Sequence, residues 1–258
     1  MPITANAKTY YIMDNREGRP LVDENDNDVR SSENLMPGDI IYCAPNKYEV
    51  ISVEKTVKGN TGYDVNCRCL INKSKDGKFA YIIDETKFNG FRDWLIVKEF
   101  DKNAFNSYKN SKKLYISISI IPSWITKRMK NLSEVQISES LVKKNTFAKY
   151  KKLESLSLGW CTIEKNAFAN CRKLSVINLN FTSTLEKDSF KNVKATIWYD
   201  NGIHEYDRVK GDTYKTVKSI FQIKKELKNA GFKNGTVVYV QKYNKRTGNT
   251  RVYKTIRL

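Results

Sequence analysis

Apolar residues recur with a spacing of 21 or 22 positions through the middle of this chain. The repeats are anchored, in chain order, at Phe105, Thr126, Phe147, Phe168 and Phe190. Several apolar columns keep the same register across these repeats, which excludes a chance match. A repeat this short cannot bury a core alone, so it must stack on its neighbours.

Two apolar columns flank the anchors. The column five residues before them consists of Phe100, Ile121, Val142, Ile163 and Leu185. The column three residues after them consists of Tyr108, Met129, Tyr150, Cys171 and Val193. Later positions alternate between apolar and polar, as Leu156 and Leu158 do, and they predict the strands of a parallel sheet. The "NAFANC" portion predicts a turn or a short helix that returns the chain.

The segment "IEKNAFANCRKLSVINL" resembles the BspA-like leucine-rich repeats, whose units read as an Ala-Phe, a Cys three residues after the Phe, then a Leu and an apolar strand. The resemblance covers about residues 96–200. Thr126 departs from it, because Thr126 stands where the family has Phe, and the fifth repeat is shortened. The resemblance implies a binding scaffold, often for proteins at a cell surface or of a host, and it names no ligand.

These patterns predict an α+β protein built from three parts. Residues 1–90 carry alternating β-branched segments and turns, and they are predicted to form a β-rich small barrel or sandwich. Residues 91–203 are predicted to form a short leucine-rich-repeat solenoid of about five coils of 21–22 residues. Residues 204–258 are predicted to form a basic αββ unit, in which an amphipathic helix ends at Gly231 and two strands follow.

Positive charge is concentrated in the last two thirds of the chain. The chain has 46 Lys and Arg against 28 Asp and Glu, a formal net charge of +18. Residues 1–90 contribute −2, while residues 91–210 and residues 211–258 contribute +10 each. A field confined in this way indicates an acidic partner. The alternative is a lysine-rich composition that decorates every exposed surface without a specific role.

Two columns of the repeat are basic and are predicted to face outward. The column four residues after the anchors consists of Lys109, Lys130, Lys151, Arg172 and Lys194. The column three residues before them consists of Lys102, Ser123, Lys144, Lys165 and Lys187. Stacked repeats would turn each column into a ladder with a spacing of about 4.8 Å. An acidic partner would relieve the repulsion within such a ladder, so we predict partner binding there; the alternative is a row of solvated turns.

A third column is predicted to point off the outer face of the sheet. It consists of Tyr115, Gln136, Ser157, Asn178 and Trp198. Leucine-rich-repeat proteins usually bind partners on this face, so the column is a second candidate for partner binding. In the alternative interpretation, Trp198 packs on whatever follows the last repeat.

The C-terminal strands offer an alternative kind of surface. Aromatic and basic residues interleave on their predicted outer face and at the hairpin tip: Tyr239, Tyr243, Lys245, Arg246, Arg251, Tyr253 and Arg257. Rings that stack on bases and cations that follow phosphates are typical of proteins that bind a single nucleic-acid strand. The alternative is a face that packs against the last repeat.

The sequence carries no recognisable catalytic motif. It lacks a P-loop, a dinucleotide-binding glycine pattern and a zinc signature. The only histidine, His204, has no Cys or Ser motif beside it. Cys67 and Cys69 are predicted to lie in a strand core rather than on a metal. We expect no enzyme activity, no cofactor and no metal site, and we expect the five cysteines to be reduced.

No run of about 18 apolar residues could cross a bilayer, and the first residues do not follow a signal-peptide pattern. We therefore expect the cytoplasm, or a host cytoplasm if a virus or phage encodes the chain. The predicted function is non-catalytic binding of an acidic protein partner. Binding of RNA or single-stranded DNA is the alternative, and the oligomeric state stays open.

Overall fold

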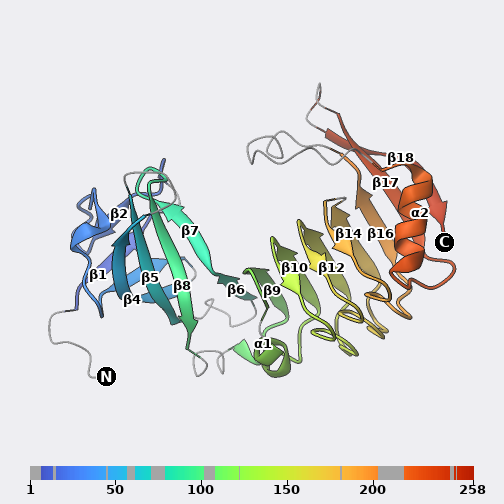
Figure 1. The fold of residues 1–258 in the computed structure, drawn as a ribbon, viewed down its shortest axis with the longest axis horizontal. Helices are drawn as coiled ribbons and strands as arrows, with labels where there is room; N and C mark the ends of the chain where they lie inside the picture. Colours follow the sequence, from blue (N-terminus) through green and yellow to red (C-terminus); the bar gives the residue numbers. More distant parts are fainter. Residues whose placement is uncertain are drawn as a thin grey trace. The chain divides into compact units, whose positions relative to one another are not determined.

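The fold comes from a computed structural model that describes residues 7–13, 16–44, 46–56, 62–70, 79–101, 108–121, 123–180, 182–202, 218–244, 247 and 249–258. The chain divides into two compact units, Met1–Lys109 and Asn110–Leu258 (Figure 1). This division differs from the three predicted ranges, because the residues after 203 belong to the same unit as the repeats.

The first unit contains a seven-stranded mixed sheet. Its strand order is β2-β1-β3-β4-β5-β8-β7. The strands are β1 (Thr9–Ile12), β2 (Leu21–Asp23), β3 (Ile40–Cys43), β4 (Asn46–Lys55), β5 (Tyr63–Leu70), β7 (Glu85–Phe88) and β8 (Asp93–Phe100). The short helix η1 (Ser32–Asn34) and the strand β6 (Phe79–Ile83) also belong to this part of the chain. Cys67 and Cys69 are buried in β5, as the sequence predicts.

The two edges of the first sheet are joined by hydrogen bonds. The backbone N–H of Leu21 in β2 donates to Asn89 Oδ1 at 2.7 Å, and the N–H of Asn89 donates to the carbonyl of Arg19 at 3.0 Å. Asn89 follows β7 directly and also donates to the buried carboxylate of Asp93 at 2.9 Å. These bonds satisfy backbone groups that an open sheet would leave at its edges.

The second unit is built on one sheet with the strand order β18-β17-β16-β14-β12-β10-β9. The strands are β9 (Lys113–Ser117), β10 (Glu134–Ser138), β12 (Ser155–Gly159), β14 (Val176–Asn180), β16 (Thr196–Asp200), β17 (Val237–Asn244) and β18 (Asn249–Arg257). A second, small sheet is formed by β11 (Leu141–Val142), β13 (Thr162–Ile163) and β15 (Thr184–Leu185). The helices α1 (Ser123–Arg128) and α2 (Ile220–Asn229) complete this unit.

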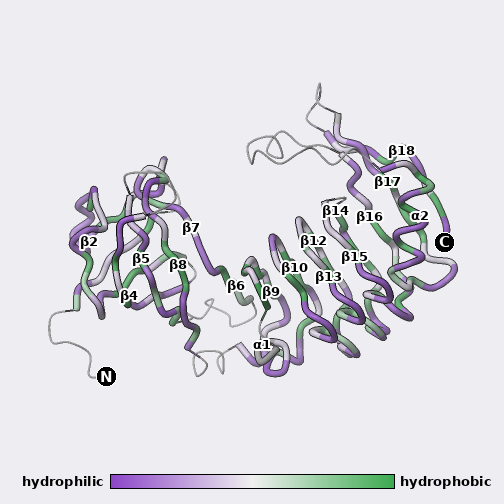
Figure 2. The backbone as a smooth tube through the Cα atoms, viewed as in Figure 1, coloured by the Kyte–Doolittle hydropathy of each residue, from purple (hydrophilic) through white to green (hydrophobic). Residues whose placement is uncertain are grey.

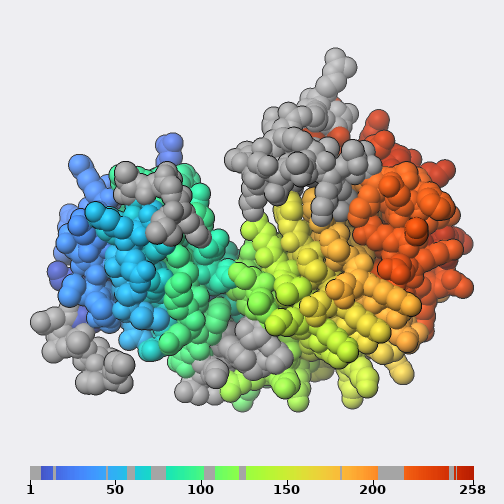
Figure 3. Space-filling view, viewed as in Figure 1, coloured from blue at the N-terminus to red at the C-terminus, as the bar shows by residue number. Residues whose placement is uncertain are grey.

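Equivalent positions of successive repeats lie opposite one another in the sheet. Leu156 of β12 pairs with Val135 of β10 on one side and with Ile177 of β14 on the other. These inward residues are fully buried, and the residues between them are polar. Figure 2 shows the resulting alternation of hydrophobic and hydrophilic residues along the strands. In Figure 3 the successive repeats form adjacent bands that run from green to orange.

The anchor phenylalanines form a continuous stack in the core. The ring centroids of Phe147 and Phe168 are 5.1 Å apart, and those of Phe168 and Phe190 are also 5.1 Å apart. Phe232, which lies outside the predicted repeats, extends the stack beyond Phe190 at 4.7 Å. The interplanar angles of 3°, 8° and 14° show that each ring lies nearly parallel to the next.

The predicted fold class is wrong. Strands dominate the described residues, and the only α-helices among them are α1 and α2, with six and ten residues. The second unit is therefore not a five-coil solenoid followed by a separate αββ unit. Instead, β17 pairs in parallel with β16, and the mixed sheet continues to the antiparallel strand β18.

Residues 229–232 explain why the C-terminal part joins the sheet. Their sequence, "NAGF", resembles the "NAF" of the repeat turns, and their backbone occupies the corresponding place. Phe168 donates its N–H to the carbonyl of Ser189 at 2.9 Å, and Phe190 donates in the same way to Ala230 at 2.8 Å. The sequence interpretation treated Gly231 only as the end of a helix and missed this turn.

Phe168→Ala is expected to lower the free energy of unfolding by about 3 to 5 kcal/mol, because it empties the centre of the phenylalanine stack. Cys171→Ser should have a smaller effect, since its Sγ lies 3.1 Å from the Phe147 carbonyl, a bond that a hydroxyl can replace. Chemical denaturation measures both changes. Phe221→Ala is the control, because Phe221 is 75% exposed; equal stability of F168A and F221A would contradict the stack.

Gly231→Ala is expected to destabilise the chain by about 1 to 3 kcal/mol. Gly231 has a φ of +86°, and a Cβ there would lie 3.0 Å from the Cα of Lys191. Gly159→Ala is the matched control, because a Cβ at Gly159 would meet nothing within 4 Å. Thermal unfolding should show a change within about 0.5 kcal/mol for G159A. If G231A were equally mild, the turn at residues 229–232 would not be packed as described.

Candidate functional site

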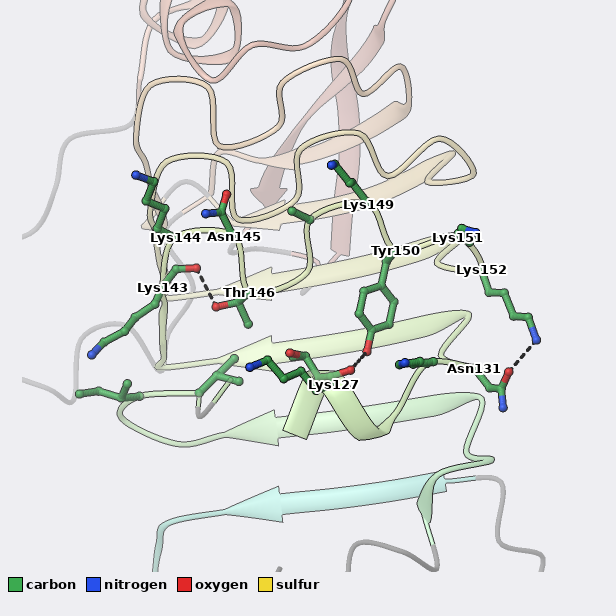
Figure 4. A pocket seen from close by; sticks show the side chains of 15 residues that line it. Lys127, Asn131, Lys143, Lys144, Asn145, Thr146, Lys149, Tyr150, Lys151 and Lys152 are labelled. Carbon is green, nitrogen blue, oxygen red and sulfur yellow. Dashed lines mark hydrogen bonds between the residues drawn. The ribbon is translucent and has the colours of Figure 1, made fainter. Parts of the chain in front are cut away.

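A pocket of about 970 Å³ opens in the second unit between α1 and the turn of the next repeat (Figure 4). Among its lining residues are seven lysines and no Asp or Glu. These lysines are Lys127, Lys130, Lys143, Lys144, Lys149, Lys151 and Lys152. Ile120, Ala148 and the ring of Tyr150 supply apolar surface, whereas Ile121, which also lines the pocket, is 1% exposed. We call this site the lysine pocket.

The lysine pocket lies where the repeat departs from its pattern. The phenylalanine stack stops at Phe147, because the preceding anchor is Thr126 and its segment forms α1 instead of a tight turn. Tyr150 spans to α1 through its hydroxyl, which donates to the carbonyls of Thr126 and Met129 at 2.5 and 2.8 Å. Burial and the nearby Cys171 thiol raise the pKa of Tyr150, so its hydroxyl stays protonated and remains a donor.

The positive charge of the lysine pocket is not neutralised by the described part of the chain. None of its seven ammonium groups forms an ion pair with a described carboxylate. Lys152 Nζ donates instead to the neutral Asn131 Oδ1 at 2.6 Å. The nearby carboxylate of Glu164 accepts from the backbone N–H of Lys144 at 2.7 Å. The pocket therefore presents ammonium groups that form no ion pair with the described carboxylates, around an apolar surface.

Two smaller pockets continue this face along the turns. One, of about 560 Å³, includes Lys149, Lys151, Arg172 and Lys173, and the next, of about 520 Å³, includes Arg172, Lys194 and Lys233. Successive pockets share lining residues: the first two share Lys149, Tyr150 and Lys151, and the last two share Asn170 and Arg172. Lys130, Lys151, Arg172 and Lys194 therefore follow one another along one face, and with the lysine pocket they make up what we call the basic turn face.

The local backbone explains how these turns hold their side chains in rows. Asn166 and Asn170 have φ of 58° and 60°, and Asp188 and Asn192 have φ of 60° and 66° in the next repeat. Asn and Asp tolerate this left-handed conformation better than most residues. Asn192 also donates its side-chain N–H to Asn170 Oδ1 at 3.0 Å, which keeps adjacent turns in register.

The two predicted ladders differ. Lys102 lies outside the described residues, and Lys109 belongs to the first unit. Lys144 lines the lysine pocket. Lys165 and Lys187 are exposed, and neither lines any of the three pockets of the basic turn face. Acidic residues accompany this second ladder, since Glu186 accepts from the backbone N–H of Lys165 at 2.9 Å. Only the ladder four residues after the anchors forms a face without carboxylates among its lining residues.

The predicted outer column of the sheet is a continuous row. Gln136 pairs with Tyr115 and Ser157, and Asn178 pairs with Ser157 and Trp198. Asn178 Nδ2 donates to Ser157 Oγ at 3.1 Å. A shallow groove of about 320 Å³ runs over this row and includes Asp200, which the sequence interpretation missed.

Trp198 packs on the strand that follows the last repeat. Its ring lies 4.7 Å from that of Tyr239, centroid to centroid, at an interplanar angle of 28°. The alternative interpretation of Trp198 is therefore confirmed. One face of its ring is occupied by Tyr239 and is not open to a ligand.

The C-terminal aromatic and basic residues do not share one face. A register shift after Val240 places Val252 opposite Gln241 and Arg251 opposite Lys242. Neighbouring positions of a strand point to opposite faces, so Arg251 lies away from the face of Tyr239 and Tyr243. Tyr253 lies under Lys242, whose Nζ is 4.3 Å from the ring centroid, and Arg257 is exposed opposite Val237. Lys245 and Arg246 lie outside the described residues.

The sequence interpretation also missed several lysines of the pocket. Lys127, Lys143, Lys149 and Lys152 lie at repeat positions that are not basic in every repeat. The break in the pattern at Thr126, followed by Lys127, was the available signal. Such a local break does not show in the repeat columns, because these contain only what the repeats share.

The described residues also include side chains of the kinds that bind metals or act as nucleophiles. Among them, no group of three or more His, Cys, Asp or Glu side chains could hold a metal ion. All five cysteines are buried and free, and burial raises the pKa of Cys69 to about 12 and that of Cys161 and Cys171 to about 11. His204 lies outside the described residues. No described helix is long and apolar enough to cross a membrane.

Comparisons with known proteins add no assignment. No family model, no curated protein and no solved structure matches this chain. The similarity to BspA-like repeats stays a prediction based on the repeat motif.

Tyr150→Phe is expected to lower stability by about 1 to 3 kcal/mol at neutral pH, because it removes the hydroxyl that donates to the carbonyls of Thr126 and Met129. The raised pKa of Tyr150 means that ionisation favours the unfolded chain once the pH exceeds the ordinary value of 10.0. The contribution of Tyr150 is therefore complete below pH 10 and is lost as the pH rises further. Denaturation of both proteins at neutral and alkaline pH measures this. A stability difference that does not shrink above pH 10 would contradict the assignment.

Proposed function

We propose that this chain is a non-catalytic binding protein that holds an acidic protein partner on the basic turn face of its second unit. The observation that carries the proposal is the lysine pocket, whose seven lysines have no carboxylate among the lining residues. Exposed lysines that serve only solubility are usually interspersed with acidic residues. A concentrated field of one sign instead accelerates association with a partner of the opposite sign.

The cations of the basic turn face lie close enough to repel one another, and an acidic partner would relieve this repulsion. Side chains on neighbouring strands or turns of a stacked structure lie about 4.8 Å apart, so Lys130, Lys151, Arg172 and Lys194 repel one another. Water and salt screen this repulsion in the free protein. An acidic surface would convert it into attraction, while Gln136, Ser157, Asn178 and Tyr115 offer a polar surface at which contacts could extend.

Binding of a single nucleic-acid strand is the second candidate. The cations of the basic turn face would also attract phosphates. Two features favour a protein partner. The lining of the lysine pocket contains no Arg, the side chain suited to bidentate phosphate recognition. The register shift in β18 puts Arg251 on the opposite face from Tyr239 and Tyr243, so fewer of the predicted cations lie beside these rings. A cytoplasmic partner, in a host cell if a virus or phage encodes the chain, fits this proposal.

Changing Lys130, Lys151 and Arg172 together to Gln is expected to weaken binding to poly-glutamate at least tenfold at low salt, mainly through a slower on-rate. The melting temperature should stay the same or rise slightly, because repulsion is removed. The matched control changes Lys8, Lys55 and Lys98 to Gln, which removes the same charge from exposed positions of the first unit.

Fluorescence anisotropy with labelled poly-glutamate and with a single-stranded oligonucleotide of equal charge measures both candidates. Tighter binding of poly-glutamate, lost in the triple variant and kept in the control, supports the proposal. Equal losses of poly-glutamate affinity in the two variants would contradict the proposal, because the basic turn face would then bind no better than any other exposed lysines. Tighter binding of the oligonucleotide at every salt concentration would favour the second candidate.

A further inference from the structure

The lysine pocket combines two features that a ligand must satisfy together. Its rim is cationic, and Ile120 and Ala148 add apolar surface to its lining. Ile120 is 49% exposed and lies in the same pocket as the lysines. Its volume of about 970 Å³ is at the upper end of the roughly 300–1,000 Å³ of pockets that enclose most of a small ligand. It can therefore receive a side chain together with its backbone.

Resting on the proposed function, we infer that the lysine pocket recognises a short acidic segment of the partner that carries one bulky apolar residue. The apolar residue enters between α1 and the turn at residues 143–152, and flanking carboxylates meet the lysines of the rim. A purely anionic ligand would neutralise the lysines but would leave Ile120 uncovered. A purely apolar ligand would bury Ile120 but would leave the lysines repelling one another in a drier surrounding.

The walls of the pocket are fixed enough to select such a segment. Tyr150 is held between Phe147, at 5.5 Å between ring centroids, and the carbonyls of α1. Thr146 Oγ1 donates to the carbonyl of Lys143 at 2.7 Å, and Lys152 is held by Asn131 (Figure 4). A pocket with walls held in this way loses little conformational freedom on binding. The other lysine side chains form no ion pair with a described carboxylate and remain adjustable, so the sequence of acidic residues need not be unique.

The test compares two labelled peptides of equal length and charge that consist of Asp, Glu and Ser, one with a central Leu and one with a central Ala. On the unmodified chain at low salt, anisotropy should show about tenfold tighter binding of the Leu peptide, the gain expected from burying the larger side chain. Equal affinity of the two peptides would overturn the inference while leaving an acidic partner in place. If the oligonucleotide binds and neither peptide does, the proposed function fails as well.

Ile120→Ser should reduce the preference for the Leu peptide to within about twofold and leave binding of the Ala peptide unchanged. Phe221→Ser is the matched control, because it removes an exposed apolar side chain of the same unit from α2, away from the pocket. A preference for Leu that survives in I120S would overturn the inference. The peptide comparison needs no variant, so it decides the matter even if I120S does not fold.

Discussion

The second unit depends on the stacking of like turns upon one another. Each turn buries one phenylalanine against the next, and each donates backbone N–H groups to its neighbour, as Phe168 does to Ser189. The two interactions reinforce each other, because parallel ring stacking requires the same register that the hydrogen bonds set. A turn can join the stack only if it matches the others in length and in its left-handed positions. Phe232 and Gly231 meet this requirement, and so the C-terminal strands continue the sheet.

The lysine pocket, which we propose as the binding surface, lies at the place where this stacking stops. Thr126 cannot extend the ring stack, and its segment forms α1, which leaves a space beside the turn of the next repeat. Lysines from both sides of this space face a common pocket. The same register that aligns the buried phenylalanines aligns Lys130, Lys151 and Arg172 on the exposed side. Core packing and surface charge are thus two consequences of one periodicity.

The balance of charge distinguishes the surfaces of this unit. Glu164 and Glu186 accept hydrogen bonds from the backbone N–H groups of Lys144 and Lys165, and their negative charges partly offset the positive charge of that ladder. The lining of the lysine pocket itself contains no Asp or Glu, and Glu164 contacts only the backbone N–H of its Lys144. Repulsion without a counter-charge destabilises a folded chain, and a binding surface is a common reason for a protein to keep it. The outer row of the sheet is neutral and shallow, which suits it to supporting contacts more than to anchoring a partner.

The sequence by itself determined the apolar columns, the parallel pairing of the repeat strands and the basic column that faces outward. These are periodic features, and a period is visible without coordinates because each repeat meets the same environment. It also marked Thr126 as an exception, and it placed Cys67 and Cys69 in a core.

Only the tertiary structure decided how the chain folds where it departs from the repeat pattern. The predictions of an α+β class and of a separate αββ unit were wrong. The helix pattern before Gly231 was the stronger sequence signal and hid the repeat-like turn at residues 229–232. The packing of Phe232 on Phe190 shows that this turn belongs to the stack. The face of Arg251 depended on a single-residue register shift, which no alternation pattern predicts. The lysine pocket arose from residues of two different repeats that meet across a gap. Local sequence records what each residue prefers, whereas a pocket depends on which distant residues are left facing the same space.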